Sequence, residues 1–572
     1  MQQFRDTRAT PDTVVVVHRI LNDLESLGNA LSSWIYHNPV LTHFTAASEV
    51  DLNSMPYVSG AGLDTGKICL EDTRRGVLGE ITDWINMTED NTRPIFWLHG
   101  GAGTGKSFIA HTIADRFAKL DRLGSCYCFD RNEPAEERDK GIFTTIARDL
   151  ADRDEHFRNA LSAAIHTPSL LNIILQWRQM ILQPAQQLSE CMVGPIVIVI
   201  DALDESGDAN SREPLLHIFS GKSGKGIHKE CRIDRLPPNI RILLTSRPLP
   251  DIANALKNAE HVTAKSMDSI PRQSTKRDIR RYVLGELSDL EGMNMEKVSA
   301  ELAHGSGGSF EWARLACAFV KNDNMGGLTA EERFKRVLTR NKDDLLDNIY
   351  ALTLETIFPQ RNSDSTIALH RFRSLMAQII STAEPLRLVS LNSMRRHFSE
   401  SKEFEVDVVI KSMGALLSGI TDPSMTIRPL HASFPEFLSD KDRSGKFCVD
   451  FSGIHDELAF ASLGVMKKQL RFNICKLPSS YLPNSEVPHL AEKIKENISP
   501  ELLYSCRFWT YHLRRTHVNS FLANEVKAFF DHERLLFWFE VLSLEKEISS
   551  CIPSLSLVLE WANVCEPIIL LG

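Results

Sequence analysis

Gly100-Gly-Ala-Gly-Thr-Gly-Lys-Ser107 is the stretch that decides the fold of this chain of 572 residues. It follows an apolar run over residues 94–99 that is typical of a strand. It leads into residues 108–117, where apolar side chains recur at helical spacing. A strand, a glycine-rich loop and a helix in this order are the context that a P-loop requires. The residues that we expect to bind nucleotide phosphates are Gly100, Gly101, Ala102, Gly103, Thr104, Gly105, Lys106 and Ser107.

The residue types in this loop suit phosphate chemistry. The glycines let backbone N–H groups turn toward phosphate oxygens, and a helix that begins near Lys106 adds the positive end of its dipole. Lys106 would reach the β- and γ-phosphates, and the Ser107 hydroxyl would bind Mg²⁺. A simple tight turn is the alternative, which the full spacing and its context argue against.

Length and composition describe an ordinary globular chain of several domains. The apolar content of 43% and the charged content of 24% are typical, and 572 residues exceed a single core. A net charge of −9 offers no general attraction to nucleic acid. No apolar run approaches the roughly 18 residues of a membrane span, and the N-terminus lacks a signal-peptide core. The eleven scattered cysteines include no C-x-x-C pair, so we expect reduced thiols in a cytoplasmic protein.

Strand and helix signals alternate in the first half of the chain. The strand-like runs are residues 94–99, 125–129, 195–200 and 240–245. Helical periodicity fills the intervals, for example over residues 142–150, 157–165 and 173–182. Apolar strands separated by helices predict a parallel sheet with helices on both faces, so the expected fold class is α/β. After about residue 268 the pattern is helical, except for a short hairpin expected within 416–431.

These patterns divide the chain into three parts. The first, over residues 1–67, holds one helix, around residues 13–34, and a linker. The second is the α/β domain over 68–267, and the third is a largely helical remainder that contains the expected hairpin.

A second signal for nucleotide chemistry is the buried strand that ends at Asp201. A carboxylate at this place is the Walker B arrangement, in which Asp201 holds Mg²⁺. Asp204 and Glu205 follow, and either carboxylate is a candidate to polarise the attacking water, the choice between them being open. The alternative for such paired acids is a helix N-cap, which suits Asp204 or Asp208.

A third signal is the strand over residues 240–245, which is followed by Ser246, Arg247 and a proline. Ligands of open α/β sheets bind at the carboxyl ends of strands, so Arg247 would face the same crevice as the P-loop. A guanidinium there can stabilise the γ-phosphate. The alternative is a surface arginine that caps a turn.

Together, Gly100–Ser107, Asp201-Ala-Leu-Asp-Glu205 and Leu244-Thr-Ser-Arg-Pro248 resemble the NACHT branch of the STAND NTPases, in particular the mushroom-type fungal NACHT proteins. Further matching phrases extend the resemblance over about residues 68–572. They include Cys69-Leu-Glu-Asp-Thr-Arg74, Gly307-Gly-Ser-Phe-Glu-Trp-Ala313 and the segment around His431. The resemblance implies ATP or ADP with Mg²⁺ as ligands. It also implies that the helical remainder consists of a first helical domain over 268–345, a winged-helix domain over 346–440 and a C-terminal helical domain over 441–572.

The resemblance also implies a role for His431. In this family a histidine near the end of the winged-helix domain contacts the β-phosphate of ADP, and His431 matches its position. From the residues alone, a lone histidine followed by Ala-Ser-Phe is more often a core histidine. Gly307–Ala313 departs from the wider family because it lacks the proline that packs on adenine. Phe310 and Trp312 are alternatives for that contact, and both are equally suited to the core.

STAND proteins act as nucleotide-dependent switches, so the resemblance implies slow hydrolysis, nucleotide-dependent homo-oligomers and an unidentified protein ligand. No repeat of any period follows, so we expect no C-terminal repeat sensor. A steady-turnover ATPase or kinase is the first alternative. A winged-helix nucleic-acid regulator is the second. Its candidate recognition helix over 406–417 has Lys411 as its one basic residue, so we expect no nucleic-acid partner.

Overall fold

The structure is a computed structural model that describes most of the chain beyond residue 54. The described residues are 55, 57–58, 60–87, 92–129, 141–164, 172–187, 195–221, 233–290, 292–321, 328–339, 345–359, 363–398, 404–420, 422–478, 484, 487–516, 520–530 and 533–563. The helix expected around residues 13–34 lies outside them.

The chain separates into two compact units. The first unit contains Ser48–Ile357 together with His431–Ser433, and the second contains Phe358–Leu430 and Phe434–Gly572. The five segment boundaries stay predictions.

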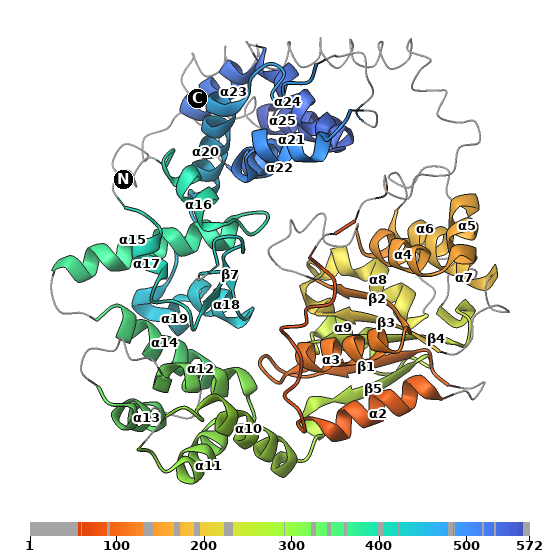
Figure 1. The fold of residues 1–572 in the computed structure, drawn as a ribbon, viewed down its shortest axis with the longest axis vertical. Coiled ribbons are helices and arrows are strands. Elements are labelled where there is room, and N and C mark those ends of the chain that lie inside the picture. Colours follow the sequence, from red (N-terminus) through yellow and green to blue (C-terminus); the bar gives the residue numbers. More distant parts are fainter. Residues whose placement is uncertain are drawn as a thin grey trace. The chain divides into compact units, whose positions relative to one another are not determined.

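A five-stranded sheet forms the centre of the first unit (Figure 1). Its strands are β1 (Ile95–His99), β2 (Leu123–Cys128), β3 (Ile196–Asp201), β4 (Ile240–Ser246) and β5 (Val262–Ser266). They are parallel and lie in the order β2-β3-β4-β1-β5. Because β4 lies between β1 and β3, the carboxyl ends of these three parallel strands lie side by side at the same end of the sheet.

Both faces of the sheet are covered by helices, because successive strand residues point to opposite faces and both sets are apolar. On one face, Phe96 and Val199 pack with α2 (Arg75–Asn86) and α3 (Lys106–Lys119). The other face, which includes Trp97, packs against later helices, among them α4 (Ile142–Arg153). The expected α/β sheet with helices on both faces is confirmed.

The four predicted strands form within two or three residues of their expected bounds, and so do the helices expected over 108–117, 142–150, 157–165 and 173–182. The helix expected over 173–182 consists of α6 (Ile173–Gln176) and a π-helical turn over Trp177–Leu182. Strand β5 was not predicted, because only Val262 among its five residues is buried. An edge strand of this kind is held by its backbone pairing to β1 and carries little apolar signal.

The remaining helices of the first unit surround the sheet or follow it along the chain. They are α5 (Glu155–Ala164), α7 (Gln183–Gln187), α8 (Ala209–Ser220), α9 (Pro250–Leu256), α10 (Arg272–Glu286), α11 (Met295–Gly305), α12 (Phe310–Lys321), α13 (Ala330–Leu338) and α14 (Leu345–Ile357).

The second unit is largely helical. Its helices are α15 (Ser363–Ser381), α16 (Leu388–Arg395), α17 (Asp407–Ile410), α18 (Ser433–Ser439), α19 (Lys441–Ser444), α20 (Ile454–Gln469), α21 (Leu490–Asn497), α22 (Pro500–Leu513), α23 (Ser520–Phe530), α24 (Arg534–Leu544) and α25 (Cys551–Asn563). Trp509 and Trp538 are fully buried in its core, with ring centroids 6.1 Å apart. Among the described residues, none of the helices combines the length and apolar character that a membrane span needs.

The hairpin expected within 416–431 is confirmed as β6 (Leu417–Ser418) paired antiparallel with β7 (Arg428–Pro429). The single helix expected over 406–417 is wrong. Helix α17 ends at Ile410, and the chain turns before β6 begins at Leu417. The β-branched Val408 and Val409 and the later Gly414 are weak helix formers, which explains the early end.

Candidate nucleotide-binding site

The loop between β1 and α3 has the backbone of a phosphate-binding loop. Gly103 and Gly105 adopt left-handed conformations, with φ of 72° and 92°. Gly105 is the N-cap residue of α3, and a glycine has no side chain with which to cap the helix. The first N–H groups of α3 are therefore available to an anion, and the helix dipole favours negative charge there.

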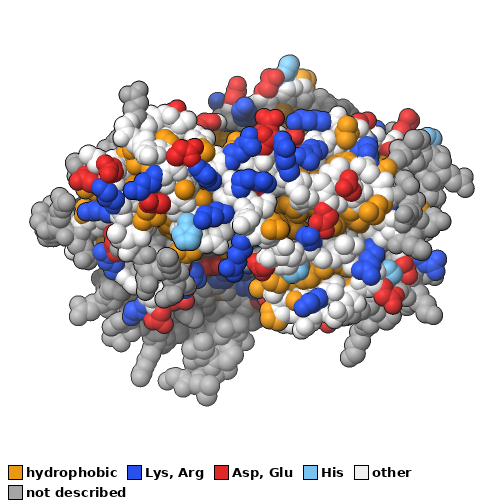
Figure 2. All heavy atoms as spheres, turned by 90° about the horizontal axis from the view of Figure 1, so that it is seen from below, with side chains coloured by type: hydrophobic (Ala, Val, Ile, Leu, Met, Phe, Trp, Pro, Cys, Tyr) orange, Lys and Arg blue, Asp and Glu red, His pale blue; other side chains and the backbone are white. Residues whose placement is uncertain are grey.

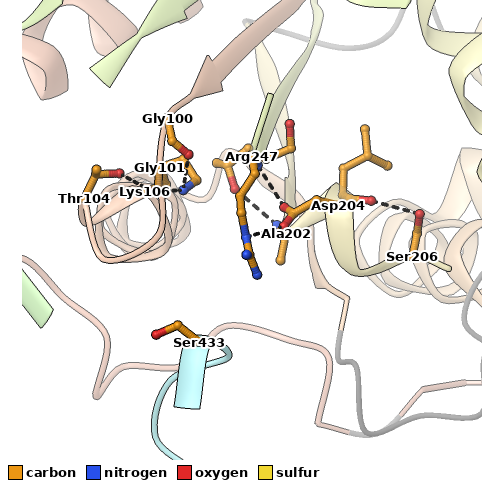
Figure 3. A network of polar contacts seen from close by, with 12 residues as sticks. Gly100, Gly101, Thr104, Lys106, Ala202, Asp204, Ser206, Arg247 and Ser433 are labelled. Carbon is orange, nitrogen blue, oxygen red and sulfur yellow. Dashed lines mark hydrogen bonds and ion pairs between the residues drawn. The ribbon is translucent and has the colours of Figure 1, made fainter. Parts of the chain in front are cut away.

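Lys106 folds back onto the loop that precedes it. Its Nζ donates hydrogen bonds to the carbonyl oxygens of Gly100 and Gly101, each at 2.9 Å (Figure 3). Burial lowers the pKa of Lys106 below its usual value, while the carboxylates of Asp204 and Asp201 oppose that shift. Lys106 is thus an ammonium group held between the loop and the acids of β3.

The strand register explains why Asp201 is surrounded by donors. Cys128 is paired with Asp201 across β2 and β3, and Ile200 is paired with Leu244 across β3 and β4, one position before Asp201 and Thr245. Asp201 is 1% exposed. Its Oδ1 accepts a short hydrogen bond from the Thr245 hydroxyl, and its Oδ2 accepts one from the Cys128 thiol at 3.5 Å. The carboxylate that follows the predicted Walker B strand is therefore fixed in orientation by its two neighbouring strands.

Asp204 and Arg247 form a buried ion pair. The Arg247 side chain donates from Nε to Asp204 Oδ2 at 2.9 Å, and its backbone N–H donates to Asp204 Oδ1 at 3.0 Å (Figure 3). The chain reaches this position because Ala202, just after Asp201, takes a left-handed conformation with φ of 58°. Glu205, the next residue, is half-buried. Both oxygens of Asp204 thus hold Arg247 at the carboxyl end of β4.

Two further arginines surround this network. Arg212 of α8 donates to the Asp204 carbonyl at 3.1 Å and forms an ion pair with Asp251 of α9. Arg74 lies just before α2 and donates from Nη2 to the Thr104 carbonyl at 2.7 Å. Its backbone N–H donates to Asp278 of α10 at 3.0 Å. Arg74 therefore joins the P-loop to α10.

The outer side of the P-loop is attached to α12. The Gly103 carbonyl accepts hydrogen bonds from the backbone N–H groups of Phe310 at 2.9 Å and Glu311 at 3.4 Å. These are the first two residues of α12, whose N–H groups lack partners within their own helix. The Arg74 guanidinium also lies over the Phe310 ring, 4.7 Å from its centroid. A carbonyl of the phosphate-binding loop thus caps a helix that begins about 200 residues later in the chain.

His431 belongs to the same unit as the P-loop. Its Nδ1 accepts a hydrogen bond from the Ser433 backbone N–H at 3.2 Å and lies 2.7 Å from the Ser433 hydroxyl. That hydroxyl in turn lies 2.9 Å from the hydroxyl of Tyr350 on α14. A neutral ring that accepts at Nδ1 carries its proton on Nε2, so the second nitrogen is a donor. Burial lowers the pKa of His431 and favours this neutral form.

The residues present fit a magnesium nucleotide. Mg²⁺ takes oxygen ligands, usually one or two carboxylates together with substrate phosphates. The oriented Asp201 carboxylate and the half-buried Ser107 hydroxyl at the start of α3 are oxygens of this kind. Lys106 supplies a cation for the phosphates. Bound Mg²⁺ would neutralise charge that develops on the phosphates.

The structure brings most of the predicted residues together. The backbone N–H of Gly100 donates to the Ser246 carbonyl at 3.3 Å, which ties the P-loop to β4, and the Thr104 hydroxyl donates to the Gly101 carbonyl at 2.9 Å. Lys106 lies within electrostatic reach of Asp201, Asp204, Glu205 and Arg247. Sequence reasoning missed the supporting residues, which are Arg74, Cys128, Arg212, Thr245 and Ser433. Arg74 carried a signal, because it belongs to a phrase that matched the resemblance.

The surface near α10 is rich in charge. This helix carries the five basic residues Arg272, Lys276, Arg277, Arg280 and Arg281. Arg280 forms an ion pair with Glu296, and Arg281 with Asp72 at 2.6 Å. Figure 2 shows basic side chains gathered on one face of the molecule with acidic side chains among them. Acidic neighbours therefore offset part of the positive charge.

Comparisons with known proteins support the nucleotide-binding character of the first unit. Residues 76–247 match the family described as Nephrocystin 3, N-terminal, and this match contains the P-loop, Asp201 and Arg247. This part of the chain is similar to P-loop NTPase-like nucleotide-binding domains.

No curated protein matches the chain. Among solved structures, one titled "Structure of Drosophila ORC bound to DNA" matches at 12% identity and covers 66% of this chain and 96% of that one. Its TM-score of 0.25 is too low to support an argument about fold or function.

Proposed function

We propose that this chain is a nucleotide-dependent switch of the STAND type. It binds ATP or ADP with Mg²⁺ through Gly100–Ser107 and Asp201, hydrolyses ATP slowly, and controls its self-association through the nucleotide that it holds. The ordered motifs resemble those of the fungal NACHT proteins, and the scattered cysteines without a C-x-x-C pair favour the cytoplasm.

The observation that carries this proposal is the cap that the P-loop provides to α12. The Gly103 carbonyl accepts from Phe310 and Glu311, while Arg74 holds the adjacent Thr104 carbonyl. Each of these two carbonyls shares a peptide group with an N–H of the loop that would bind a phosphate. A phosphate bound by these N–H groups would therefore also affect the carbonyls that hold α12 and Arg74. Exchange of ADP for ATP would therefore change the contacts that hold α12, which follows the sheet along the chain.

His431 supports the same proposal. Its Nε2 is a hydrogen-bond donor, because Nδ1 accepts from Ser433. A donor of this kind suits the contact with the ADP β-phosphate that the resemblance implies. Loss of that contact when ATP replaces ADP would shift the population toward an open form. A ligand at about a thousand times its dissociation constant stabilises the state that it prefers by roughly 4 kcal/mol, which is enough to select a conformer.

For hydrolysis we assign different roles to the neighbouring acids. Both carboxylate oxygens of Asp204 hold Arg247, so we assign Asp204 to the orientation of this arginine. Arg247 would stabilise charge on the γ-phosphate. Glu205 would polarise the attacking water.

Native mass spectrometry with and without ATP tests the proposal, because it reads both bound nucleotide and oligomeric state. We expect wild-type protein to carry nucleotide and to change its oligomeric state when ATP replaces ADP. Lys106→Ala should lose most of the nucleotide. Equal nucleotide content in both proteins would overturn the assignment of the P-loop.

The same preparations separate the alternatives. A steady-turnover ATPase would release many equivalents of phosphate in a multiple-turnover assay, whereas a switch releases about one per cycle of exchange. A kinase would transfer the phosphate to an acceptor. A nucleic-acid regulator would bind a DNA duplex with an affinity that falls as salt is added. The structure argues against this alternative, because α17 is too short to serve as a recognition helix.

A further inference from the structure

A buried histidine on the P-loop helix has an unexplained nitrogen. His111 lies on α3, one turn beyond the P-loop, and is 1% exposed. Among the described residues, its Nε2 has no hydrogen-bond partner and is shielded from solvent. A buried polar atom of this kind is costly unless water, an ion or a neighbouring group satisfies it.

The other ring nitrogen determines what that partner is. His111 Nδ1 accepts a hydrogen bond from the Asp64 backbone N–H at 3.1 Å. A nitrogen that accepts must offer its lone pair, so the proton of the neutral ring is on Nε2. Burial lowers the pKa of His111 and favours the neutral ring. The missing partner of Nε2 is therefore a hydrogen-bond acceptor.

The carboxylate of Asp201 is a hydrogen-bond acceptor close to His111. The ligand-type atoms of His111, Cys128 and Asp201 all lie within 4.8 Å of one another. A single ordered water can bridge polar groups at such a separation, with the imidazole N–H, the thiol and the carboxylate as its partners.

The same three side chains are also a possible set of ligands for a transition metal, such as Zn²⁺. Their protonation opposes this alternative. A metal needs the lone pair of Nε2 and a thiolate, but Nε2 carries the proton and the Cys128 thiol donates to Asp201. Burial also raises the pKa of Cys128 well above its usual value.

We propose that His111 is a positioning residue for Asp201, and that its Nε2–H donates through one buried water to the Asp201 carboxylate. Together with Thr245 and Cys128, it fixes the direction in which this carboxylate presents its remaining lone pairs to Mg²⁺. Groups that orient a metal ligand in this way typically affect metal affinity by about 10–100-fold. The inference rests on the proposed binding of a magnesium nucleotide.

The test compares ADP affinity with Mg²⁺ and in EDTA, by calorimetric titration of the full chain. His111→Leu removes the donor, and we expect it to weaken binding about 10–100-fold in Mg²⁺ but to leave binding in EDTA unchanged. His111→Gln keeps an N–H donor and should restore most of the affinity. Ile113→Val, a change at a fully buried position of the same helix, is the matched control for loss of packing.

A second comparison covers the case in which His111→Leu does not fold. His111→Met also removes the donor, and in the wild-type background it should weaken binding in Mg²⁺ about 10–100-fold. In an Asp201→Asn background the same change should have no effect on affinity in Mg²⁺, because the carboxylate that His111 serves is gone. An equal weakening by His111→Met in both backgrounds would overturn the inference.

Other results would also overturn it. They are equal weakening with Mg²⁺ and in EDTA, no weakening in either, or stoichiometric zinc in wild-type protein that His111→Leu loses. Failure of the proposed function looks different, because wild-type protein would then bind no ADP under either condition.

Discussion

The Thr245 hydroxyl makes two hydrogen bonds with the end of β3. It donates to Asp201 Oδ1, and it accepts from the Ala202 backbone N–H at 3.1 Å. Thr245→Val keeps the shape of the side chain but leaves both partners unsatisfied in a buried place. We expect a loss of about 1–3 kcal/mol in the free energy of unfolding, measured by urea denaturation without nucleotide.

Thr263→Val is the control for this substitution. Thr263 is a half-buried residue of the edge strand β5, where valine suits a strand at least as well as threonine. Its free energy of unfolding should stay within about 0.5 kcal/mol of wild type. An equal loss in both variants would mean that the hydroxyl of Thr245 has no special role.

At the residue scale, the sequence predicts the groups that follow apolar strands and misses the groups that orient them. Asp201 is visible because it comes just after a continuous apolar run, and Arg247 because it follows the end of the next strand-like run by two residues. Thr245 and Cys128 act on Asp201 only because β4 and β2 are the two neighbours of β3. Strand order depends on contacts between distant segments, and no local pattern records it.

At the element scale, Gly103 controls the approach of α12 to the P-loop. A Cβ atom on Gly103 would lie 2.8 Å from Ser309 Oγ and 2.9 Å from Glu311 Cβ, and its φ of 72° disfavours other residues. Gly103→Ala should therefore separate α12 from the loop and destabilise the first unit by about 1–3 kcal/mol. Hydrogen exchange at the Phe310 and Glu311 amides, measured without nucleotide, should become faster.

Gly101→Ala is the matched control in the same loop. A Cβ atom on Gly101 would have its nearest neighbour, Thr104 Cγ2, at 3.9 Å, and the residue has no positive φ. The amides of α12 should exchange at the wild-type rate in this variant. Faster exchange in both variants would mean that the P-loop sequence, and not the contact with α12, governs this helix.

Elements differ in how well the sequence predicts them. Strands β1, β3 and β4 are buried on both faces, so their apolar runs are long and clear. Strand β5 is defined by its pairing with β1 and not by apolar residues. Helix α17 ends early because the chain turns where the apolar pattern also suits a longer helix. The cap of α12 by Gly103 joins segments about 200 residues apart, so no local pattern predicts it.

At the scale of the whole molecule, the second unit should lose stability in acid. The second unit contains a histidine pair in which His455 Nδ1 lies 3.0 Å from His512 Nδ1, while His512 Nε2 lies 2.7 Å from the Tyr504 hydroxyl. Burial and the nearby Arg515 lower the pKa of His455 to about 4, and burial lowers that of His512 well below its usual value.

Because these pKa values are lower in the folded chain than in the unfolded chain, the unfolded chain binds more protons between about pH 6.5 and pH 4. The contribution of the pair to stability is present above about pH 6.5 and is lost as the pH falls through this range. We expect α20 and α22 to lose protection from hydrogen exchange at pH 5 relative to pH 7, after correction for intrinsic rates.

His455→Phe removes one titrating ring and should make this pH dependence less steep. His489→Asn is the control, because His489 is an exposed histidine with φ of 56°, a conformation that asparagine also accepts. A pH dependence that is the same in all three proteins would contradict the role of the pair.

The two edges of the sheet also bear on how molecules of this chain can meet. Strand β5 is five residues long, carries Lys265 paired with Glu80 at 2.7 Å, and has its Val262 carbonyl occupied by Arg93. At the opposite edge, the Cys128 N–H donates to the Ala61 carbonyl and the Leu123 carbonyl accepts from Arg153. Short, charged or covered edges of this kind resist the addition of a foreign strand and the growth of fibres. The assembly that we propose to follow nucleotide exchange would therefore use surfaces other than the two edges of the sheet.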